Sequence, residues 1–369
     1  MSHSSVCRWG FLSTASIGCK NWQAVMDAGN AQVTAVASRA VEPAARFIDE
    51  CQAECPMNVK PKAMGNYDEL IQSQDVDAIY VPLPTGLRKD WILKAAAAGK
   101  HVLIEKPAGD SAADVEEMIN ACRKAGVQLM DGVMFMHSTR LPEMRSALDA
   151  GAVGDIRRAT AQFSFHADEE FVRTNIRTHS VLESMGALGD LGWYTSRWIL
   201  WAMNWEMPSR LTARIHSEMQ HPHSPGKVPA ELSAELEFSN GKSASMHCSF
   251  VSQHCQLVMV GGTKGYLTLQ DFVLPFEGST QLEYQILNSA FGSQGCQFTM
   301  NPGRATHKVD EIPSNGPGSQ ESRMIQTFSA NVLKGVPDPF WPEVTLKTQR
   351  VLDACLKSAR SGSSAISLT

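Results

Sequence analysis

The first 131 residues alternate short apolar runs with helical patterns, and this alternation restricts the possible folds more than any other feature of the chain. Strands that alternate with helices form parallel sheets with helices on both faces, because the crossovers between parallel strands are right-handed. We therefore expect a doubly wound parallel sheet in an N-terminal domain of residues 1–132. The expected strands are residues 7–12, 33–37, 78–81, 102–105 and 128–131, and the expected helices lie near residues 17–28, 41–52, 88–98 and 111–125.

Lys106 follows the apolar run that ends at Ile104, with Glu105 between them, and Pro107 comes next. Proline has no backbone N–H and disfavours helix at the residue before it, so Glu105 and Lys106 should lie extended at the carboxyl edge of the sheet. Ligands of open α/β sheets bind at this edge. Lys106 is therefore either a ligand-contacting residue or a solvated lysine at the end of a strand, paired with Glu105.

The turn after the first apolar run reads Gly-Phe-Leu-Ser-Thr-Ala-Ser-Ile-Gly over residues 10–18. A dinucleotide fingerprint has glycines where this chain has Ser13 and Ala15, followed by one at the position of Gly18. Small residues still allow the backbone to approach a pyrophosphate, and the next helix offers unpaired N–H groups. The turn is either a degraded phosphate-binding loop or an ordinary connection. In the first case the cofactor contacts come from Ser13, Thr14, Ala15, Ser16 and Ile17.

Ser38 and Arg39 end the second apolar run, where an enzyme that uses NAD usually carries an acidic residue for the ribose hydroxyl. A guanidinium binds phosphate in a bidentate way, so Arg39 favours the 2′-phosphate of NADP. The alternative is that Arg39 is a solvated loop residue.

A loop with two prolines, Pro82 and Pro84, follows the third apolar run. These prolines stiffen the loop at the same sheet edge as Lys106, where a cofactor could lie across it. We therefore expect cofactor contacts from Pro82, Leu83, Pro84, Thr85, Glu105 and Lys106.

Beyond residue 132 long alternating runs replace the short buried ones, which predicts a large, mostly antiparallel open sheet in an α+β domain of residues 133–369. We assign substrate binding and oligomerisation to this domain. The expected strands are residues 158–166, 211–219, 230–238, 243–251 and 256–260, with helices near 142–150, 319–334 and 344–360. Hairpin turns are expected at residues 239–241 and 261–265, and loops at 217–228 and 289–320.

Asp190 and Tyr194 lie in the stretch Gly-Ala-Leu-Gly-Asp-Leu-Gly-Trp-Tyr over residues 186–194. On a helix their spacing of four places both side chains on one face. The glycines weaken a helix and indicate the close approach of another backbone or of a ligand. Tyr194 is either a functional residue or a core tyrosine with a satisfied hydroxyl.

The composition restricts the possible partners. A net charge of -5 without clustered lysine and arginine gives no basic surface for nucleic acid, and no apolar stretch is long enough to span a membrane. The nine cysteines are scattered, and the one close pair, Cys51 and Cys55, lacks nearby histidines, so free thiols are favoured over disulfides or zinc. We expect a cytoplasmic protein. An open sheet face, if apolar, would pair with a second copy, which predicts a homodimer or higher oligomer.

Five stretches taken in order resemble the Gfo/Idh/MocA oxidoreductases, and the resemblance covers nearly the whole chain. They are residues 13–18, 37–39, 80–85, 105–107 and 186–194. The chain looks closest to the branch of dimeric dihydrodiol dehydrogenases and NADP-dependent D-xylose dehydrogenases. The resemblance implies a Rossmann domain followed by a mostly antiparallel α/β domain, with nicotinamide and substrate between them. It also implies that Lys106 touches cofactor and substrate, and that Asp190 and Tyr194 complete the catalytic site.

Three departures limit what the resemblance implies. Ser13 and Ala15 replace fingerprint glycines, as in some members of this branch. Arg88 stands where many members have a histidine, and residues 137–140 differ from the usual aromatic, arginine and proline pattern. The substrate class therefore does not follow from the family. We expect Phe165 and Arg177, which precede the Asp190 stretch, to bind the small-molecule substrate.

Oxidation of a carbinol by hydride transfer needs a group that accepts the hydroxyl proton. Tyrosine, with an ordinary pKa of about 10, can do so when a cation such as Lys106 stabilises the phenolate. We therefore expect an NADP-dependent oxidoreductase that acts on a sugar, polyol or dihydrodiol, with NADP preferred to NAD. The alternative is a non-catalytic NADP-binding sensor or regulatory protein. A metal-dependent hydrolase would need clustered histidines and carboxylates, whereas His221 and His223 lie in an expected loop and are not part of such a cluster.

Overall fold

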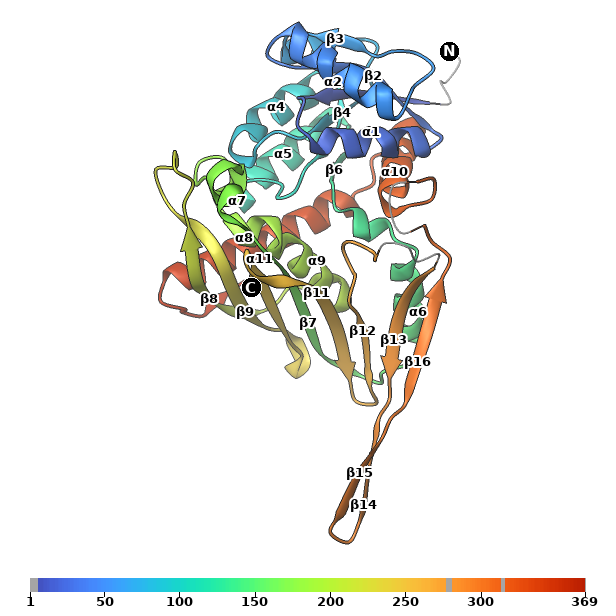
Figure 1. Ribbon diagram of the computed structural model, residues 1–369, viewed down its shortest axis with the longest axis vertical. Coiled ribbons are helices and arrows are strands. Elements are labelled where there is room, and N and C mark those ends of the chain that lie inside the picture. The colour runs from blue at the N-terminus through green and yellow to red at the C-terminus, as the bar shows by residue number, and fades with distance from the viewer. Residues whose placement is uncertain (1–5, 277–280, 313–315, 369) are drawn as a thin grey trace. The chain divides into compact units, whose positions relative to one another are not determined.

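The computed structural model describes residues 6–276, 281–312 and 316–368, and the chain divides into two compact units. The first unit consists of Met1–His137, His179–Ser184 and Ser314–Gln349, and the second of Ser138–Thr178, Met185–Pro313 and Arg350–Thr369. Each unit contains one large sheet (Figure 1). The roles that we assign to residues 1–132 and 133–369 stay predictions.

The sheet of the first unit has six strands, all parallel, in the order β3-β2-β1-β4-β5-β6. The predicted doubly wound sheet is therefore confirmed. β1 and β4 are neighbours at the point where the strand order reverses, and ligands of such sheets bind at the carboxyl ends of the strands beside this point. The strands are β1 (Cys7–Leu12), β2 (Ala31–Ala37), β3 (Lys62–Met64), β4 (Ala78–Val81), β5 (His101–Ile104) and β6 (Leu129–Asp131).

The helices that connect these strands begin and end at residues suited to those positions. The Ser111 hydroxyl accepts a hydrogen bond from the Asp114 N–H at the start of α5, and Gly126, in the left-handed region with φ of 69°, ends it. Neither β3 nor α3 was expected, because these elements are short and β3 buries only one side chain well. The helices are α1 (Ile17–Asp27), α2 (Val41–Glu54), α3 (Tyr67–Gln72), α4 (Thr85–Ala97) and α5 (Ala112–Ala125).

The sheet of the second unit has nine strands in the order β16-β13-β12-β11-β7-β10-β9-β8-β17. Its pairings are antiparallel except for that of β7 with β10, so the predicted mostly antiparallel sheet is confirmed. The strands are β7 (Ile156–His166), β8 (Arg210–Met219), β9 (Val228–Glu237), β10 (Ser243–Ser249), β11 (Val251–Gly262), β12 (Tyr266–Leu269), β13 (Leu282–Leu287), β16 (Arg304–Val309) and β17 (Ile366–Ser367).

Helices cover one face of this sheet. α9 packs on β7 and β10, and the Ala213 N–H of β8 donates to the hydroxyl of Ser358 in α11 at 2.8 Å. The remaining helical elements of the described chain are η1 (Met134–His137), α6 (Arg140–Asp149), α7 (Glu169–Thr174), η2 (Ile176–Thr178), α8 (Gly186–Asp190), α9 (Gly192–Ala202), η3 (Ser239–Gly241), α10 (Gln320–Lys334) and α11 (Phe340–Arg360).

The opposite face of the sheet is polar over β7, β8, β9 and β10. We predicted a dimer through this face on the condition that the face is apolar. These four strands do not meet that condition. The side chains on this part of the face are those of Thr160, Gln162, Thr212, Arg214, Ser233, Glu235, Ser245 and His247.

The prediction of loops over residues 289–320 is wrong. This stretch contains β14 (Ala290–Gln294), β15 (Gln297–Asn301) and β16, and β14 and β15 form a two-stranded sheet of their own. Its strands were missed because β14 and β15 have no buried side chain and β16 has one, so no apolar run marks them.

Candidate active site

Lys106 lies at the carboxyl edge of the first sheet, directly beyond β5 and Glu105, as predicted. Its side chain is half-buried, and the peptide bond between Lys106 and Pro107 is cis. The backbone N–H of Lys106 donates to Glu105 Oε2 at 3.3 Å, while the hydroxyl of Tyr80 donates to Glu105 Oε1 at 2.6 Å. Glu105 is thus held in place by β4, the neighbouring strand.

A chain of buried hydrogen bonds extends from Glu105 to the first helix. Asn21 of α1 donates through Nδ2 to the Tyr80 hydroxyl at 2.7 Å. Burial, and then the charge of Glu105, raise the pKa of Tyr80, so this hydroxyl keeps its proton and remains the donor to Glu105. The three side chains join α1, β4 and the loop that carries Lys106.

Arg88 connects the loop that follows β4 with the loop that follows β5. It is 2% exposed, and its Nε and Nη2 donate to the carbonyl oxygen of Leu83 at 3.2 and 2.6 Å. Its Nη1 donates to the carbonyl oxygens of Glu105, at 2.5 Å, and of Pro107. Burial lowers the pKa of Arg88, and the charge of Glu183 and then that of Glu105 oppose this effect. Arg88 therefore bonds to the backbone on both sides of Lys106.

Residues 179–184 pack on the start of α4 within the same unit. The N–H and the hydroxyl of Thr85 both donate to the Glu183 carboxylate, at 3.1 and 2.8 Å, and the Gly86 N–H donates to the Leu182 carbonyl oxygen. A Cβ on Gly86 would lie 2.2 Å from the carbonyl oxygen of Val181, so only glycine fits there. Thr85 therefore uses both of its donors within the protein, and its hydroxyl oxygen remains an acceptor for the predicted contact with a cofactor. Of the other predicted residues in this loop, Pro82 and Leu83 are buried and Pro84 is half-buried.

The turn between β1 and α1 keeps the shape of a glycine-rich loop. Ser13 has φ of 136°, a conformation that side chains disfavour, and its hydroxyl accepts from the Ala15 N–H at 3.3 Å. Gly18 is required by packing, because a Cβ there would lie 2.9 Å from the ring of Phe47. Thr14 and Ala15 are half-buried and Ser16 and Ile17 are exposed, so the turn presents accessible atoms at the first turn of α1.

Ser38 and Arg39 follow β2 at the same edge. Ser38 is buried, and its N–H donates to the Met64 carbonyl oxygen at 3.1 Å. Arg39 is exposed. Burial raises the pKa of Tyr67, and the nearby positive charge of Arg39 opposes this increase. The guanidinium is therefore accessible to an anionic ligand.

The other predicted catalytic residues belong to the second unit. Asp190 ends α8 and Tyr194 lies in α9; both are nearly buried, at 8% and 6% exposed. The two residues lie in successive helices that meet at Leu191, whose backbone is in the right-handed helical region with φ of -98° and ψ of -38°. Arg177, predicted as a substrate residue, forms an ion pair with Asp190, with 2.8 Å between Nε and Oδ1.

Tyr194 packs against a phenylalanine of β7, whereas the predicted substrate residue Phe165 belongs to another aromatic group. The ring of Tyr194 packs edge-on against Phe163 of β7, with 5.6 Å between centroids. Phe165, the predicted substrate residue, instead packs against Phe171 and Phe250 at 5.4 and 5.1 Å. Both phenylalanines lie on the same side of β7, so the alternation of this strand could have identified Phe163 as a further candidate.

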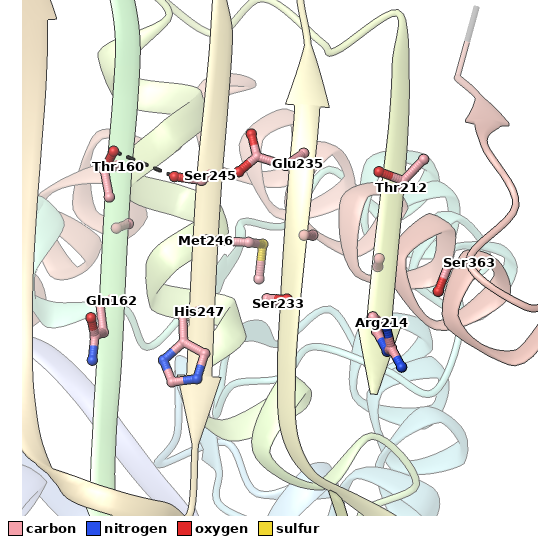
Figure 2. A pocket seen from close by; sticks show the side chains of 13 residues that line it. Thr160, Gln162, Thr212, Arg214, Ser233, Glu235, Ser245, Met246, His247 and Ser363 are labelled. Atoms are coloured by element: carbon pink, nitrogen blue, oxygen red, sulfur yellow. Dashed lines mark hydrogen bonds between the residues drawn. The ribbon is translucent and has the colours of Figure 1, made fainter. Parts of the chain in front are cut away.

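A hollow of about 460 Å³ lies on the open face of the second sheet, lined by strands β7, β8, β9 and β10. Figure 2 shows the side chains that line it. Most of the side chains that surround it are polar, including those of Gln162, Arg214 and His247. None of the predicted site residues lines this hollow.

The described residues lack two features, a cluster of metal ligands and a membrane-spanning helix. Over residues 6–276, 281–312 and 316–368, no three side chains of His, Cys, Asp or Glu are arranged to hold a metal ion. In the same ranges no helix combines the length and apolarity needed to cross a bilayer.

Comparison with known proteins assigns the family. The family described as "Oxidoreductase family, NAD-binding Rossmann fold" matches residues 7–133, and the "GFO/IDH/MocA C-terminal domain" matches residues 142–268. Trans-1,2-dihydrobenzene-1,2-diol dehydrogenase from Mus musculus is 30% identical over 275 residues, which are 73% of this chain and 76% of the mouse protein. The chain belongs to the Gfo/Idh/MocA oxidoreductase family.

Other similar proteins extend this match to most of the chain. D-xylose 1-dehydrogenase (NADP(+)) 2 from Haloferax volcanii is 27% identical over 96% of this chain and 98% of its own length. A crystal structure of a variant of KijD10, a 3-ketoreductase from Actinomadura kijaniata in complex with TDP-benzene and NADP, superposes with a TM-score of 0.76. At 23% identity over 96% of this chain and 98% of KijD10, that likeness concerns the fold.

Proposed function

We propose that this Gfo/Idh/MocA protein is an NADP-dependent oxidoreductase that transfers a hydride between nicotinamide and a carbinol or carbonyl group. Its proposed substrate is a sugar, a polyol or a trans-dihydrodiol. Of these classes, the mouse relative is named for a dihydrodiol and the Haloferax relative for the sugar D-xylose. The observation that carries the proposal is the position of Lys106 at the carboxyl end of a parallel Rossmann strand, held by backbone contacts on both sides.

The first unit offers the groups that would hold the cofactor. The turn of Ser13 and the start of α1 would hold a pyrophosphate, because residues 13–16 have small side chains and Ser16, directly before α1, is exposed. Ser38 and the exposed Arg39 would receive the ribose and its 2′-phosphate, which favours NADP over NAD. When bound, the nicotinamide supplies the hydride chemistry itself.

Proton transfer would depend on three residues, Lys106, Asp190 and Tyr194. Tyr194 accepts the hydroxyl proton of a carbinol, and the ammonium of Lys106 stabilises the resulting phenolate. Asp190 is nearly buried and paired with Arg177, which fixes the carboxylate relative to α9 and Tyr194. The half-exposed Arg177 and the aromatic side chain of Phe165 would contact the substrate, as polar and apolar groups respectively.

The test is turnover of a panel of sugars, polyols and trans-dihydrodiols with NADP⁺, followed by NADPH absorbance. Lys106→Met should abolish turnover while leaving cofactor affinity within about tenfold, because the phosphate and adenosine contacts lie elsewhere. Tyr194→Phe should lower kcat by about a hundredfold or more, the usual scale for loss of a general acid or base. Lys124→Met, at an exposed lysine of α5, is the matched control and should leave both parameters unchanged.

Two outcomes would contradict the proposal. Tight NADPH binding without turnover of any panel member would favour a non-catalytic sensor on the same scaffold. Normal kcat in Tyr194→Phe would remove this tyrosine from the mechanism.

We also propose that the protein works in the cytoplasm as a homodimer or higher oligomer. Free thiols suit a reducing compartment, and the nine cysteines form no disulfide with one another. The open face of the second sheet is polar, so the support that it gives to self-association comes from the size of the nine-stranded sheet.

A further inference from the structure

The start of α1 packs on the second half of α2, and this contact brings two cysteine sulfurs together. Cys51 of α2 donates a hydrogen bond through Sγ to the Sγ of Cys19 in α1, with 3.4 Å between the sulfurs. A disulfide needs a sulfur–sulfur distance of about 2.05 Å, so the two sulfurs would have to approach by about 1.4 Å. The sequence singled out Cys51 and Cys55 by their spacing, whereas folding brings Cys51 to a cysteine 32 residues earlier.

Contacts on both sides of this sulfur pair hold the two helices together. On one side the backbone of α1 lies directly against α2, because a Cβ on Gly18 would be 2.9 Å from the ring of Phe47. On the other side Nε1 of Trp22 donates to the carbonyl oxygen of Cys55 at 3.0 Å. Phe47 and Cys55 lie four residues to either side of Cys51. The fold therefore fixes the positions from which the two sulfurs meet.

The two thiols differ in their access to solvent. Cys51 is 3% exposed, whereas Cys19 is half-buried. Burial, and then the hydrogen bond to Cys19, raise the pKa of Cys51, so this thiol keeps its proton at neutral pH. A dissolved oxidant therefore reaches Cys19 first, and Cys51 is the neighbouring thiol that can react with the oxidised product.

We propose that Cys19 and Cys51 are a redox modification site, in which a peroxide converts the two thiols into a disulfide between α1 and α2. Hydrogen peroxide transfers one oxygen to the sulfur of Cys19, which gives a sulfenic acid and releases one water. The sulfur of Cys51 then attacks the sulfur of Cys19. The S–O bond breaks, and the leaving hydroxide takes the proton of Cys51 as a second water. The two thiols together lose two electrons, which reduce the peroxide.

The disulfide is reversible. Two equivalents of a thiol such as glutathione reduce it by thiol–disulfide exchange and become a disulfide themselves. Disulfides that form in a reducing compartment are usually transient and redox-sensing, so this site is compatible with the free thiols of the structure.

The disulfide would act on the start of α1, which follows the turn of Ser13. Cys51 lies within α2, whereas Cys19 lies in the first turn of α1, so this first turn takes up most of the approach of the sulfurs. The Cys19 N–H donates to the carbonyl oxygen of Ser16 at 3.1 Å, and a shift of Cys19 therefore moves the residue directly before the helix.

A shift of this turn should weaken cofactor binding. This consequence rests on the proposed function, in which the turn and the start of α1 hold the pyrophosphate. We expect the disulfide form to bind NADPH about fivefold less tightly or worse, which is the lower end of the usual coupling between two sites.

The first test is peptide mapping after treatment with hydrogen peroxide in the absence of reductant. Trypsin releases Cys19 in residues 9–20, and it releases Cys51 together with Cys55 in residues 47–62. We expect these two peptides to be joined, with the loss of two hydrogen atoms, and to separate on reduction. Cys19→Ser and Cys51→Ser should each abolish the joined peptide. The matched control Cys55→Ser should retain it, which would place the bond at Cys51.

Two precautions keep this result specific. All forms carry Cys296→Ser, because the exposed thiol of Cys296 could join two molecules. Thermal unfolding of every variant in the presence of reductant checks that the fold is retained.

The second test measures the coupling in both directions. Fluorescence titration of the oxidised and the reduced protein gives the two dissociation constants for NADPH. Saturating NADPH should lower the equilibrium constant for disulfide formation in a glutathione buffer by the same factor, because coupling between two equilibria is reciprocal. The Cys55→Ser control should show the same coupling as the parent protein.

Absence of the joined peptide, its persistence in Cys19→Ser, or its loss in Cys55→Ser would overturn the proposed site. Equal NADPH affinities of the oxidised and reduced forms would overturn the coupling to the turn. A protein that binds no NADPH in either form would contradict the proposed function instead, while the peptide map still decides whether the disulfide forms.

Discussion

Ser13 has a backbone conformation that usually belongs to glycine. Its φ of 136° keeps the tight turn of a dinucleotide-binding loop, while Gly18, the fingerprint glycine that remains, is the one that the ring of Phe47 requires. The sequence could predict the position of this turn from the strand before it and the helix after it. It could not predict that a serine would hold the strained conformation, because that depends on the surrounding fold.

For other residues, the sequence predicted the position in the fold but not the partner side chains. Strand boundaries and Pro107 were enough to locate Lys106 at the sheet edge. The partner of Asp190 could not be inferred, because Arg177 reaches it through folding and not through regular spacing. The same holds for Glu183, which binds Thr85 from 98 residues away.

Arg39 provides a test of cofactor choice. A guanidinium makes charge-assisted bonds to a 2′-phosphate, each contributing about 1.5–3 kcal/mol, so NADPH should bind at least about tenfold more tightly than NADH. Arg39→Asp should reverse the preference, since a carboxylate repels phosphate and accepts from a ribose hydroxyl. Dissociation constants from fluorescence titration of both forms check this. Arg123→Asp, the same charge change at an exposed arginine of α5, is the control.

Equal affinities for the two cofactors in the native protein would leave Arg39 as a solvated loop residue. The same conclusion would follow if Arg39→Asp and Arg123→Asp changed the affinities alike.

At the scale of elements, Arg88 explains how two loops keep their positions. Its guanidinium bonds to carbonyl oxygens in the loop after β4 and in the loop after β5. The sequence marked Arg88 as a departure from the family pattern, but it gave no reason to expect a buried cation at this position. Periodicity predicts which face of a helix is buried, whereas the bonds of a buried polar group depend on loops that periodicity does not describe.

Replacement of Arg88 by methionine should affect both stability and catalysis. The variant leaves buried carbonyl oxygens without a donor, at a cost of about 1–3 kcal/mol each, so the free energy of unfolding should fall by at least about 2 kcal/mol. Under conditions where the variant is folded, kcat should fall more than cofactor affinity, because the loop that carries Lys106 loses its support. Urea unfolding and steady-state kinetics measure the two effects.

Arg88→Lys separates charge from geometry. A lysine retains the charge but not the planar fork that reaches both loops, so its kcat should stay below that of the wild type. A fully stable and active Arg88→Met enzyme would show that the two loops hold their positions without this residue.

At the scale of the whole molecule, the division into units does not follow the chain linearly. Residues 314–349 belong to the first unit, where Ser329 accepts a hydrogen bond from Trp9 Nε1 and Thr345 donates to Asp131. The alternation of strands and helices predicted the parallel sheet, and the alternating runs predicted the antiparallel one. Which strands are neighbours, such as β7 and β10, depends on pairing between distant segments, which local patterns do not encode.

Isotope transfer from the nicotinamide to the substrate is the direct test of whether this protein transfers a hydride. The protein would be incubated with the carbonyl forms of the panel substrates and with NADPH that carries deuterium at C4. Each of the two stereochemical forms of the labelled NADPH would be used in turn, and the masses of the products would be measured by mass spectrometry. We expect a carbinol that contains one deuterium with the wild type, and none with Lys106→Met. Bound, unconsumed NADPH with no deuterated product from any panel member would contradict the proposed oxidoreductase function.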